Sequence, residues 1–389
     1  MKCASVYTYE IDDQEAAFEE IRVQLDEKIT LLKHTIGIIM CHSEFIHSGV
    51  LKHICGQLPF DLAGVTTSSQ AVNGEAGELI LTIFVMTSDD VWFRTGVTGG
   101  LDENIDAQIK SAFDKAANGA SELPKLALVF PPQFRHAGDA YVNAWQKIIP
   151  NVPIFGAVAI DDTLTFEECE TVHKGESYKT AMSFVLCYGN INPRFIVGTF
   201  SQDKVMPYKG EITKSNGAFV NEINNVNARR YFEGIGFVSD GVLNENYIFV
   251  PFVIDQKKRA DYDGIPVLRV LASFTKDGTA IFRGYVDEGS TFTMLTCETE
   301  DMLSVTRQKI EQINDLPDVN GVLLFPCIVR RMMTMRENPL MELEIVKDTI
   351  APGIPFMMGY AGGEISPTLI KNDIPTNRFH NYSLVILVV

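Results

Sequence analysis

Apolar segments recur along the chain in one fixed order. A segment that reads as a buried strand is followed by an amphipathic helix, by a second apolar segment that ends in a turn of small residues, and by a further strand. The order starts three times, at IGIIMC (36–41), LALVFP (126–131) and GVLLFP (321–326). In each copy the two apolar segments are separated by room for one helix, as parallel neighbours of a sheet are. The pattern predicts an α/β fold built from repeated strand–helix–strand units, with mixed sheets covered by helices.

The same pattern indicates how the chain is divided. A fourth copy between residues 246 and 296 would give two related halves with two units each, although this segment reads mostly as hairpins, with a turn signal at Asp277-Gly278. No Pro- or Ser-rich linker separates the halves, so we expect them to pack together. We place the two domains at residues 1–225 and 226–389.

Glycines mark the end of each second apolar segment. Gly64, Gly156 and Gly359 stand at corresponding positions, and the last copy continues as GYAGGE (359–364), which adds an aromatic ring and a carboxylate. Glycine lets the backbone take positive φ or lets another group come close. Because open α/β folds bind ligands at the carboxyl ends of their strands, we expect these turns to lie at a ligand site.

Composition narrows the class of partner and the compartment. The net charge of −17 and the pI near 4.9 argue against nucleic acid, whose binding needs a basic footprint. The N-terminal segment turns acidic too soon for a signal peptide, and no apolar run reaches the roughly 18 residues of a membrane span, so we expect a cytoplasmic protein. The seven cysteines include no C-x-x-C pair, which favours buried reduced thiols over a zinc site.

Short motifs give no clear signal for catalysis. The chain has no G-x-G-x-x-G, P-loop, H-E-x-x-H or G-x-S-x-G sequence. Cys41 and His42 are adjacent on a predicted strand and therefore point to opposite faces. Asp161 and Asp162 follow the second glycine turn, where a metal-binding role is weaker than capping of the turn.

Several segments together resemble the FIST family, whose FIST N and FIST C domains are bacterial sensory modules. GVTTSS and VPIFGAVAIDD are similar to the glycine motifs of FIST N. RVLASFTKDGTAIFRGYVDEGS, LLFPCIVR and IPFMMGYAGGEISP followed by RFHNYSLVIL resemble the strands and turns of FIST C. The resemblance covers residues 30 to 389. It departs from the family pattern in IVRRMMTMRENP and VTTSSQ, each of which lacks a glycine.

The resemblance implies a sensor of a small polar metabolite, such as an amino acid, with no enzymatic activity. It leaves no room for an output domain, so we expect the signal to pass to a separate partner, a histidine kinase or a diguanylate cyclase. The predicted site lies on the last two apolar segments. Arg330 would hold a ligand carboxylate, Glu364 an amine, and Tyr360 would form one wall, with the other lining residues being Gly359, Gly363, Cys327, His380 and Asn381.

Three alternatives stay open at this stage. Arg330 and Glu364 would instead neutralise each other and seal the edge. A haem-based sensor of nitric oxide, known in one branch of the family, would use His42, His173 or His380 as axial ligand. A thiol-dependent enzyme would use Cys327 as nucleophile with His380 as base.

Overall fold

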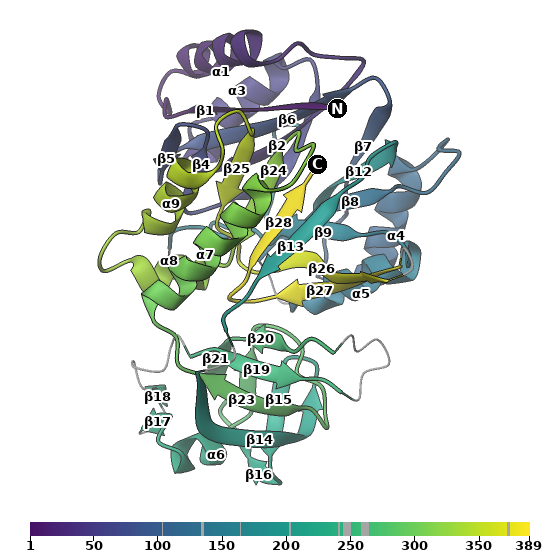
Figure 1. Ribbon diagram of the computed structural model, residues 1–389. Coiled ribbons are helices and arrows are strands. Elements are labelled where there is room, and N and C mark those ends of the chain that lie inside the picture. Colours follow the sequence, from purple (N-terminus) through teal and green to yellow (C-terminus); the bar gives the residue numbers. More distant parts are fainter. Residues whose placement is uncertain are drawn as a thin grey trace.

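The structure is a computed structural model that describes residues 1–102, 104–133, 136–163, 165–201, 204–239, 242–243, 250–257, 264–371 and 374–389. An upper body carries both termini, and a smaller sheet lies below it (Figure 1). The upper body consists of three units that share one plan, in which a first strand, a helix and a parallel strand pair are followed by a hairpin and a last strand.

The units have the following elements. The first contains β1 (Lys2–Thr8), α1 (Gln14–Lys28), β2 (His34–Cys41), α2 (Glu44–His47), α3 (Val50–Gln57), β3 (Asp61–Thr66), β4 (Gln70–Val72), β5 (Glu75–Gly77) and β6 (Leu81–Ser88). The second contains β7 (Val91–Val97), α4 (Ile105–Ala116), β8 (Leu126–Phe130), α5 (Gly138–Ile148), β9 (Ile154–Ala157), β10 (Thr171–His173), β11 (Glu176–Tyr178) and β12 (Ser183–Gly189). The third contains β13 (Arg194–Gly198), α7 (Thr299–Asn314), β24 (Val322–Pro326), α8 (Ile328–Thr334), α9 (Met341–Thr349), β25 (Phe356–Gly359), β26 (Glu364–Lys371), β27 (Ile374–His380) and β28 (Leu384–Val388).

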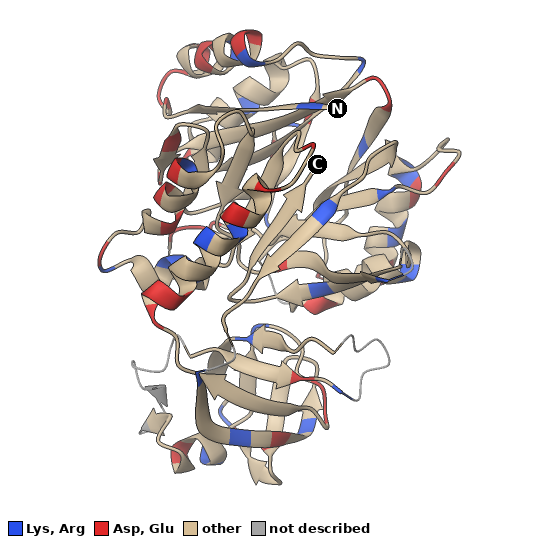
Figure 2. Cartoon of the chain, in the orientation of Figure 1, with Lys and Arg blue, Asp and Glu red and all other residues tan. Residues whose placement is uncertain are grey.

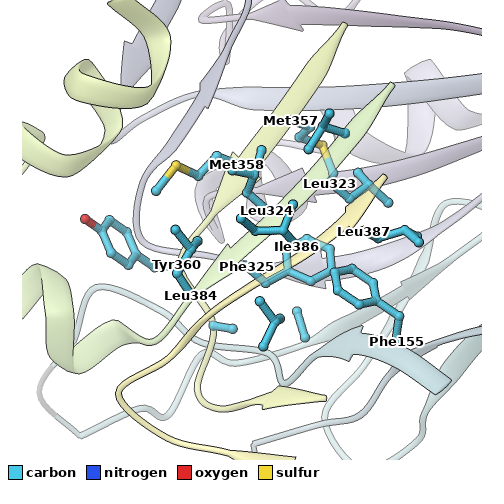
Figure 3. Packing of buried hydrophobic residues seen from close by; sticks show 14 of the residues in the cluster. Phe155, Leu323, Leu324, Phe325, Met357, Met358, Tyr360, Leu384, Ile386 and Leu387 are labelled. Atoms are coloured by element: carbon cyan, nitrogen blue, oxygen red, sulfur yellow. The ribbon is translucent and has the colours of Figure 1, made fainter. Parts of the chain in front are cut away.

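The parallel strand pairs confirm the predicted α/β class and its repeated units. β2 pairs with β3, β8 with β9, and β24 with β25, each in parallel. The last strand of each unit lies antiparallel between the first strand and this pair, which makes every sheet mixed. The strands are apolar on both faces because helices cover one face and the shared central core covers the other (Figure 3).

The hairpins tie the three units together, because each one joins the sheet of another unit. β4 pairs with β25, β10 with β3, and β26 with β9, all antiparallel. Each sheet therefore contains strands from two units, and the order closes on itself around the centre of the molecule. No unit completes its sheet from its own strands alone.

An inserted sheet separates β13 from α7. It contains β14 (Val205–Asn216), β15 (Phe219–Ile223), β16 (Val226–Asn227), α6 (Ala228–Gly234), β19 (Phe252–Asp255), β20 (Val267–Arg269), β21 (Leu271–Phe274), β22 (Ala280–Phe282) and β23 (Thr291–Leu295), and a small pair, β17 (Val238–Ser239) and β18 (Val242–Leu243), lies beside it. All of its described strand pairs are antiparallel, so the hairpin interpretation is confirmed for residues 250–257 and 264–296, and these described residues form no fourth unit. In the described part of the chain the repeated units therefore number three. The inserted sheet stands in place of a fourth, and its longest strand alternates in burial and packs on a separate aromatic core.

The glycines within the paired strands generate a first testable prediction. A Cβ at Gly64 would lie 1.7 Å from the Ile39 carbonyl oxygen, whereas a Cβ at Gly56 on α3 meets nothing within 4 Å. We expect Gly64→Ala to lower the free energy of unfolding by about 1–3 kcal/mol or more, because backbone of the neighbouring strand must move. Gly56→Ala, the matched control, should raise it by roughly 0.5–1 kcal/mol. Urea unfolding measures both, and equal stability of the two variants would contradict the close strand approach.

Candidate functional site

The predicted site residues gather at the ends of three strands of the third unit. Cys327 follows β24 and forms a parallel bridge with Ala361, which follows β25. β28 runs antiparallel to β24, so the His380–Asn381 turn before it reaches the same edge. The strand topology predicted from sequence therefore brings these segments together as expected. All of the site residues in these segments are buried: Cys327, Arg330, Gly359, Tyr360, Gly363, Glu364, His380 and Asn381.

Arg330 is bonded to Glu342 on α9. Its side chain is fully buried on α8, and its Nη2 donates to Glu342 Oε1 at 2.6 Å and to Thr306 Oγ1 at 2.8 Å. Burial disfavours the charged guanidinium, but the ion pair with Glu342 raises the pKa of Arg330. The alternative in which Arg330 pairs with Glu364 is wrong, since the nearest carboxylate is that of Glu342. This pair also occupies the fork that was predicted to hold a ligand.

Tyr360 lies at one end of the central apolar cluster (Figure 3). Its hydroxyl donates to Glu342 Oε2 at 3.3 Å, and its carbonyl oxygen accepts from Thr67 Oγ1 at 2.7 Å. Burial, followed by the charge of Glu342, raises the pKa of Tyr360 well above its ordinary value. The ring therefore supports the buried ion pair and ties the third unit to the first.

Glu364 and Cys327 form a second buried polar pair. Glu364 Oε2 accepts from the Ser383 amide at 3.2 Å, while Oε1 has no partner among the described atoms. Burial raises the pKa of Glu364 well above its ordinary value, and the Cys327 thiol only partly opposes this. Burial also raises the pKa of Cys327, which disfavours the thiolate that a nucleophile requires.

The remaining predicted residues shape the backbone around this pair. His380 Nε2 bonds to the Ser366 carbonyl oxygen at 3.1 Å, and the Asn381 side-chain oxygen has no partner within the described part of the chain. Gly363 has φ of +147°, and a Cβ there would lie 2.2 Å from the Phe379 ring. A Cβ at Gly359 would lie 2.6 Å from the Met40 sulfur. Positive φ and the close approach of the ring therefore require glycine at Gly363, whereas at Gly359 the contact is with the flexible end of the Met40 side chain.

An open cleft lies next to this buried region. It has a volume of about 290 Å³ and is bounded by the start of α5, the Gly362 turn and the inserted sheet, whose contributions include Phe219 and Arg283. Phe379 forms its floor, and a Cβ at Gly138 would lie 2.2 Å from that ring. The cleft thus borders the GYAGGE turn on the side that faces the inserted sheet.

Two cleft residues were missed by sequence reasoning. Tyr141 is 1% exposed, and its hydroxyl has no partner among the described residues. Arg283 is exposed, and no acid in the described ranges pairs with it. The protein atoms around its guanidinium group partly desolvate it, which lowers the pKa of Arg283. A signal for Arg283 was present in the FRGY segment, which belongs to one of the motifs that resemble FIST C.

A buried ion pair holds the inserted sheet on the second unit beside the cleft. Arg269 on β20 donates from Nη2 to Asp139 Oδ1 at 3.0 Å, and Asp139 Oδ2 accepts from the Tyr285 amide at 2.8 Å. Arg269 Nη1 also donates to the Phe379 carbonyl oxygen at 3.1 Å. These bonds join the cleft's two walls at one end.

The other candidates lie apart from the cleft. Asp161 accepts from the amides of Thr163 and Glu168 and so holds its own loop, while Asp162 lies 3.2 Å from His42. Desolvation lowers the pKa of His173 to about 4. The haem alternative, with His42, His173 or His380 as ligand, stays a prediction. Within the described ranges no group of three or more His, Cys, Asp or Glu side chains is placed to hold a metal ion, and no helix is long and apolar enough to cross a membrane.

Removing Glu342 should strand the buried charge of Arg330. We expect Glu342→Gln to lower the free energy of unfolding by about 3–5 kcal/mol, since an uncompensated guanidinium stays in the core. Asp348→Asn on the exposed side of the same helix should change it by less than about 0.5 kcal/mol. Chemical denaturation distinguishes the two, and a tolerated Glu342→Gln change would show that Arg330 does not depend on this carboxylate.

Glu364 should make stability depend on pH in a defined direction. Its pKa is higher in the folded than in the unfolded chain, so its contribution is fully present below the ordinary pKa of 4.5 and is lost as the pH rises toward the folded value. Between these two pKa values, ionisation of Glu364 should lower the free energy of unfolding of wild type by about 1.4 kcal/mol per pH unit. Glu364→Gln removes that loss, so its stability relative to wild type should increase from pH 5 to pH 8. Exposed Glu337→Gln should show no such trend, and a constant difference for Glu364→Gln would mean that Glu364 is already ionised in the fold.

Comparison with known proteins agrees with the resemblance seen in the sequence. The search of curated proteins found no match. Among solved structures, one reported as "Cyanuric acid hydrolase: evolutionary innovation by structural concatenation" is similar at 8% identity and a TM-score of 0.35, over 99% of this chain and 98% of that one, a likeness too low to support an argument. The FIST N domain matches residues 35–226 and the FIST C domain matches residues 228–367. These two matches cover most of the sequence, and the chain belongs to the FIST family.

Proposed function

We propose that this chain is a ligand-sensing module without catalytic activity of its own, which binds a small polar metabolite such as an amino acid. FIST domains are associated with small-ligand sensing in signal transduction. The observation that carries the proposal is the cleft of about 290 Å³ between the start of α5, the Gly362 turn and the inserted sheet. Its volume lies just below the range of about 300–1,000 Å³ that is typical of small-molecule sites, which suits a compact metabolite.

The predicted site residues take a supporting role in this proposal. Arg330 and Tyr360 both bond to Glu342 in the core, and Glu364 follows Gly362 and Gly363, the first of which lines the cleft. They hold the turn on which Gly362 reaches the cleft wall. The ligand itself contacts the open side of that turn.

The position of the cleft provides a physical route for a signal. Its two walls belong to different parts of the chain, since α5 and Gly362 lie in the upper body and Arg283 lies beside β22 of the inserted sheet. Both connections of the inserted sheet lead to the third unit, where Lys204 bonds to Asp301 on α7. A ligand that contacts both walls favours the arrangement in which they are closest and thereby shifts the population of states. The partner that reads this arrangement is a separate protein, a histidine kinase or a diguanylate cyclase.

A thermal-shift screen of amino acids and related metabolites tests the proposal. A ligand present at 100 times its Kd adds about 2.7 kcal/mol to the free energy of unfolding, because it binds the folded chain alone. We expect at least one class of compound to raise the melting temperature of wild type. A pair of variants shows whether the compound binds in the cleft. Phe219→Ser, at the rim of the cleft, should reduce the rise in melting temperature, whereas the control Val205→Ser, at a similarly exposed position of the same sheet, should leave it unchanged. A screen in which no compound raises the melting temperature would contradict the sensing function.

A further inference from the structure

We infer that the cleft recognises its ligand through a carboxylate, so that an organic acid without an ammonium group binds as well as the corresponding amino acid. This inference rests on the proposed function and names the chemical class of its ligand. It follows from the charges and unpaired donors that line the cleft, which differ from those of the rest of the protein.

The charge of the cleft is opposite to that of the chain. The sequence has 50 acidic against 33 basic residues, and acidic residues are distributed along the helices (Figure 2). No Asp or Glu is among the described residues that line the cleft, where the charged side chain is Arg283. None of the described lining side chains offers a carboxylate to an ammonium group, although the charges of Asp102 and Asp139 act on the lining residues Tyr141 and Tyr285, whereas Arg283 offers a cation to an anion. The cleft therefore selects for the acidic end of a metabolite.

Arg283 differs from the two buried arginines nearby. Arg269 is bonded to Asp139 and Arg330 to Glu342, so both guanidinium groups are neutralised by acids of the chain. Arg283 has no such partner among the described residues. A guanidinium group matches a carboxylate with two parallel hydrogen bonds, which makes Arg283 the natural contact for the anion.

The start of α5 adds a second favourable group. Asp13 and Asn104 cap α1 and α4 through their side chains, but the residue before α5 is Ala137, which offers no cap. The first amide groups of a helix carry a partial positive charge and attract anions. The charge of Asp139 in this first turn is taken up by Arg269 and by the Tyr285 amide.

Tyr141 supplies an independent sign that the cleft is built for an acceptor. Its hydroxyl is buried at the cleft, one helical turn after Ala137, and has no hydrogen-bond partner in the described part of the chain. Buried hydroxyl groups are normally paired, so an oxygen of the ligand would satisfy it. Phe379, Phe282 and Val158 provide apolar surface for the rest of the molecule. These groups together fit a small organic carboxylate with an apolar body.

Matched sets of ligands test this inference on the full chain. For the carbon skeletons of alanine, leucine and phenylalanine, the amino acid, the 2-oxo acid and the amine that lacks the carboxylate are compared by isothermal titration calorimetry. We expect the 2-oxo acid to bind within about threefold of the amino acid for at least one skeleton, and the amine to bind at least about tenfold more weakly, as loss of a charged hydrogen bond implies. Inorganic phosphate serves as a further probe and should compete weakly, since it lacks the apolar body.

Two variants and one control assign the effect to the cleft. Arg283→Gln should weaken binding of the 2-oxo acid by about tenfold or more, and Tyr141→Phe should weaken it severalfold without changing the fold. Arg230→Gln, an exposed arginine of the inserted sheet outside the cleft, should leave binding unchanged. Binding of the amino acid or amine without the 2-oxo acid, or full affinity in Arg283→Gln, would overturn the carboxylate inference and leave the sensing function standing. The sensing function itself would be contradicted only by the absence of any ligand in the wider screen.

Discussion

The three strand ends that meet at the centre of the upper body determine its construction. The Ile160 amide donates to the Thr66 carbonyl oxygen, and the Gly362 amide donates to that of Val158. Thr67 Oγ1 donates to the Tyr360 carbonyl oxygen at 2.7 Å. Buried backbone groups need partners, and these turns obtain them from one another. Each unit therefore depends on the other two, through the turns at the centre and through the hairpins that cross between sheets.

Burial in the core also determines which partners the charged side chains have and how their pKa values shift. In the core, the guanidinium groups of Arg330 and Arg269 are bonded to the carboxylates of Glu342 and Asp139, and burial raises the pKa of Glu364. Such pairs cost desolvation and are tolerated only with complete hydrogen bonding. The cleft departs from this rule because its cation and its buried hydroxyl lack partners in the described chain. Unpaired polar atoms also occur in the core, at Glu364 Oε1 and Asn381 Oδ1, but the cleft combines an unpaired hydroxyl with a cation that has no acid partner in the described chain.

Much of the fold followed from the sequence for a definite physical reason. Strands that are buried on both faces are apolar throughout, so their repeated order identified the three parallel pairs, and the rule for such pairs placed Cys327 beside the GYAGGE turn. The partner of Arg330 was not predictable, because Glu342 reads as one of several acids on an amphipathic helix and its burial depends on how α9 is rotated. The cleft was not predictable either. Tyr141 and Arg283 come from separate parts of the chain, and their proximity depends on how the inserted sheet is held by Arg269.

Hydrogen–deuterium exchange with and without the tightest-binding of the three 2-oxo acids tests the central claim most directly, namely that the ligand lies between the upper body and the inserted sheet. The account predicts slower exchange on both walls of the cleft, at residues 136–141 at the start of α5 and at residues 281–285 at the end of β22 and just after it. Protection of one wall alone, or protection confined to the buried segments around Arg330 and Glu364, would contradict it.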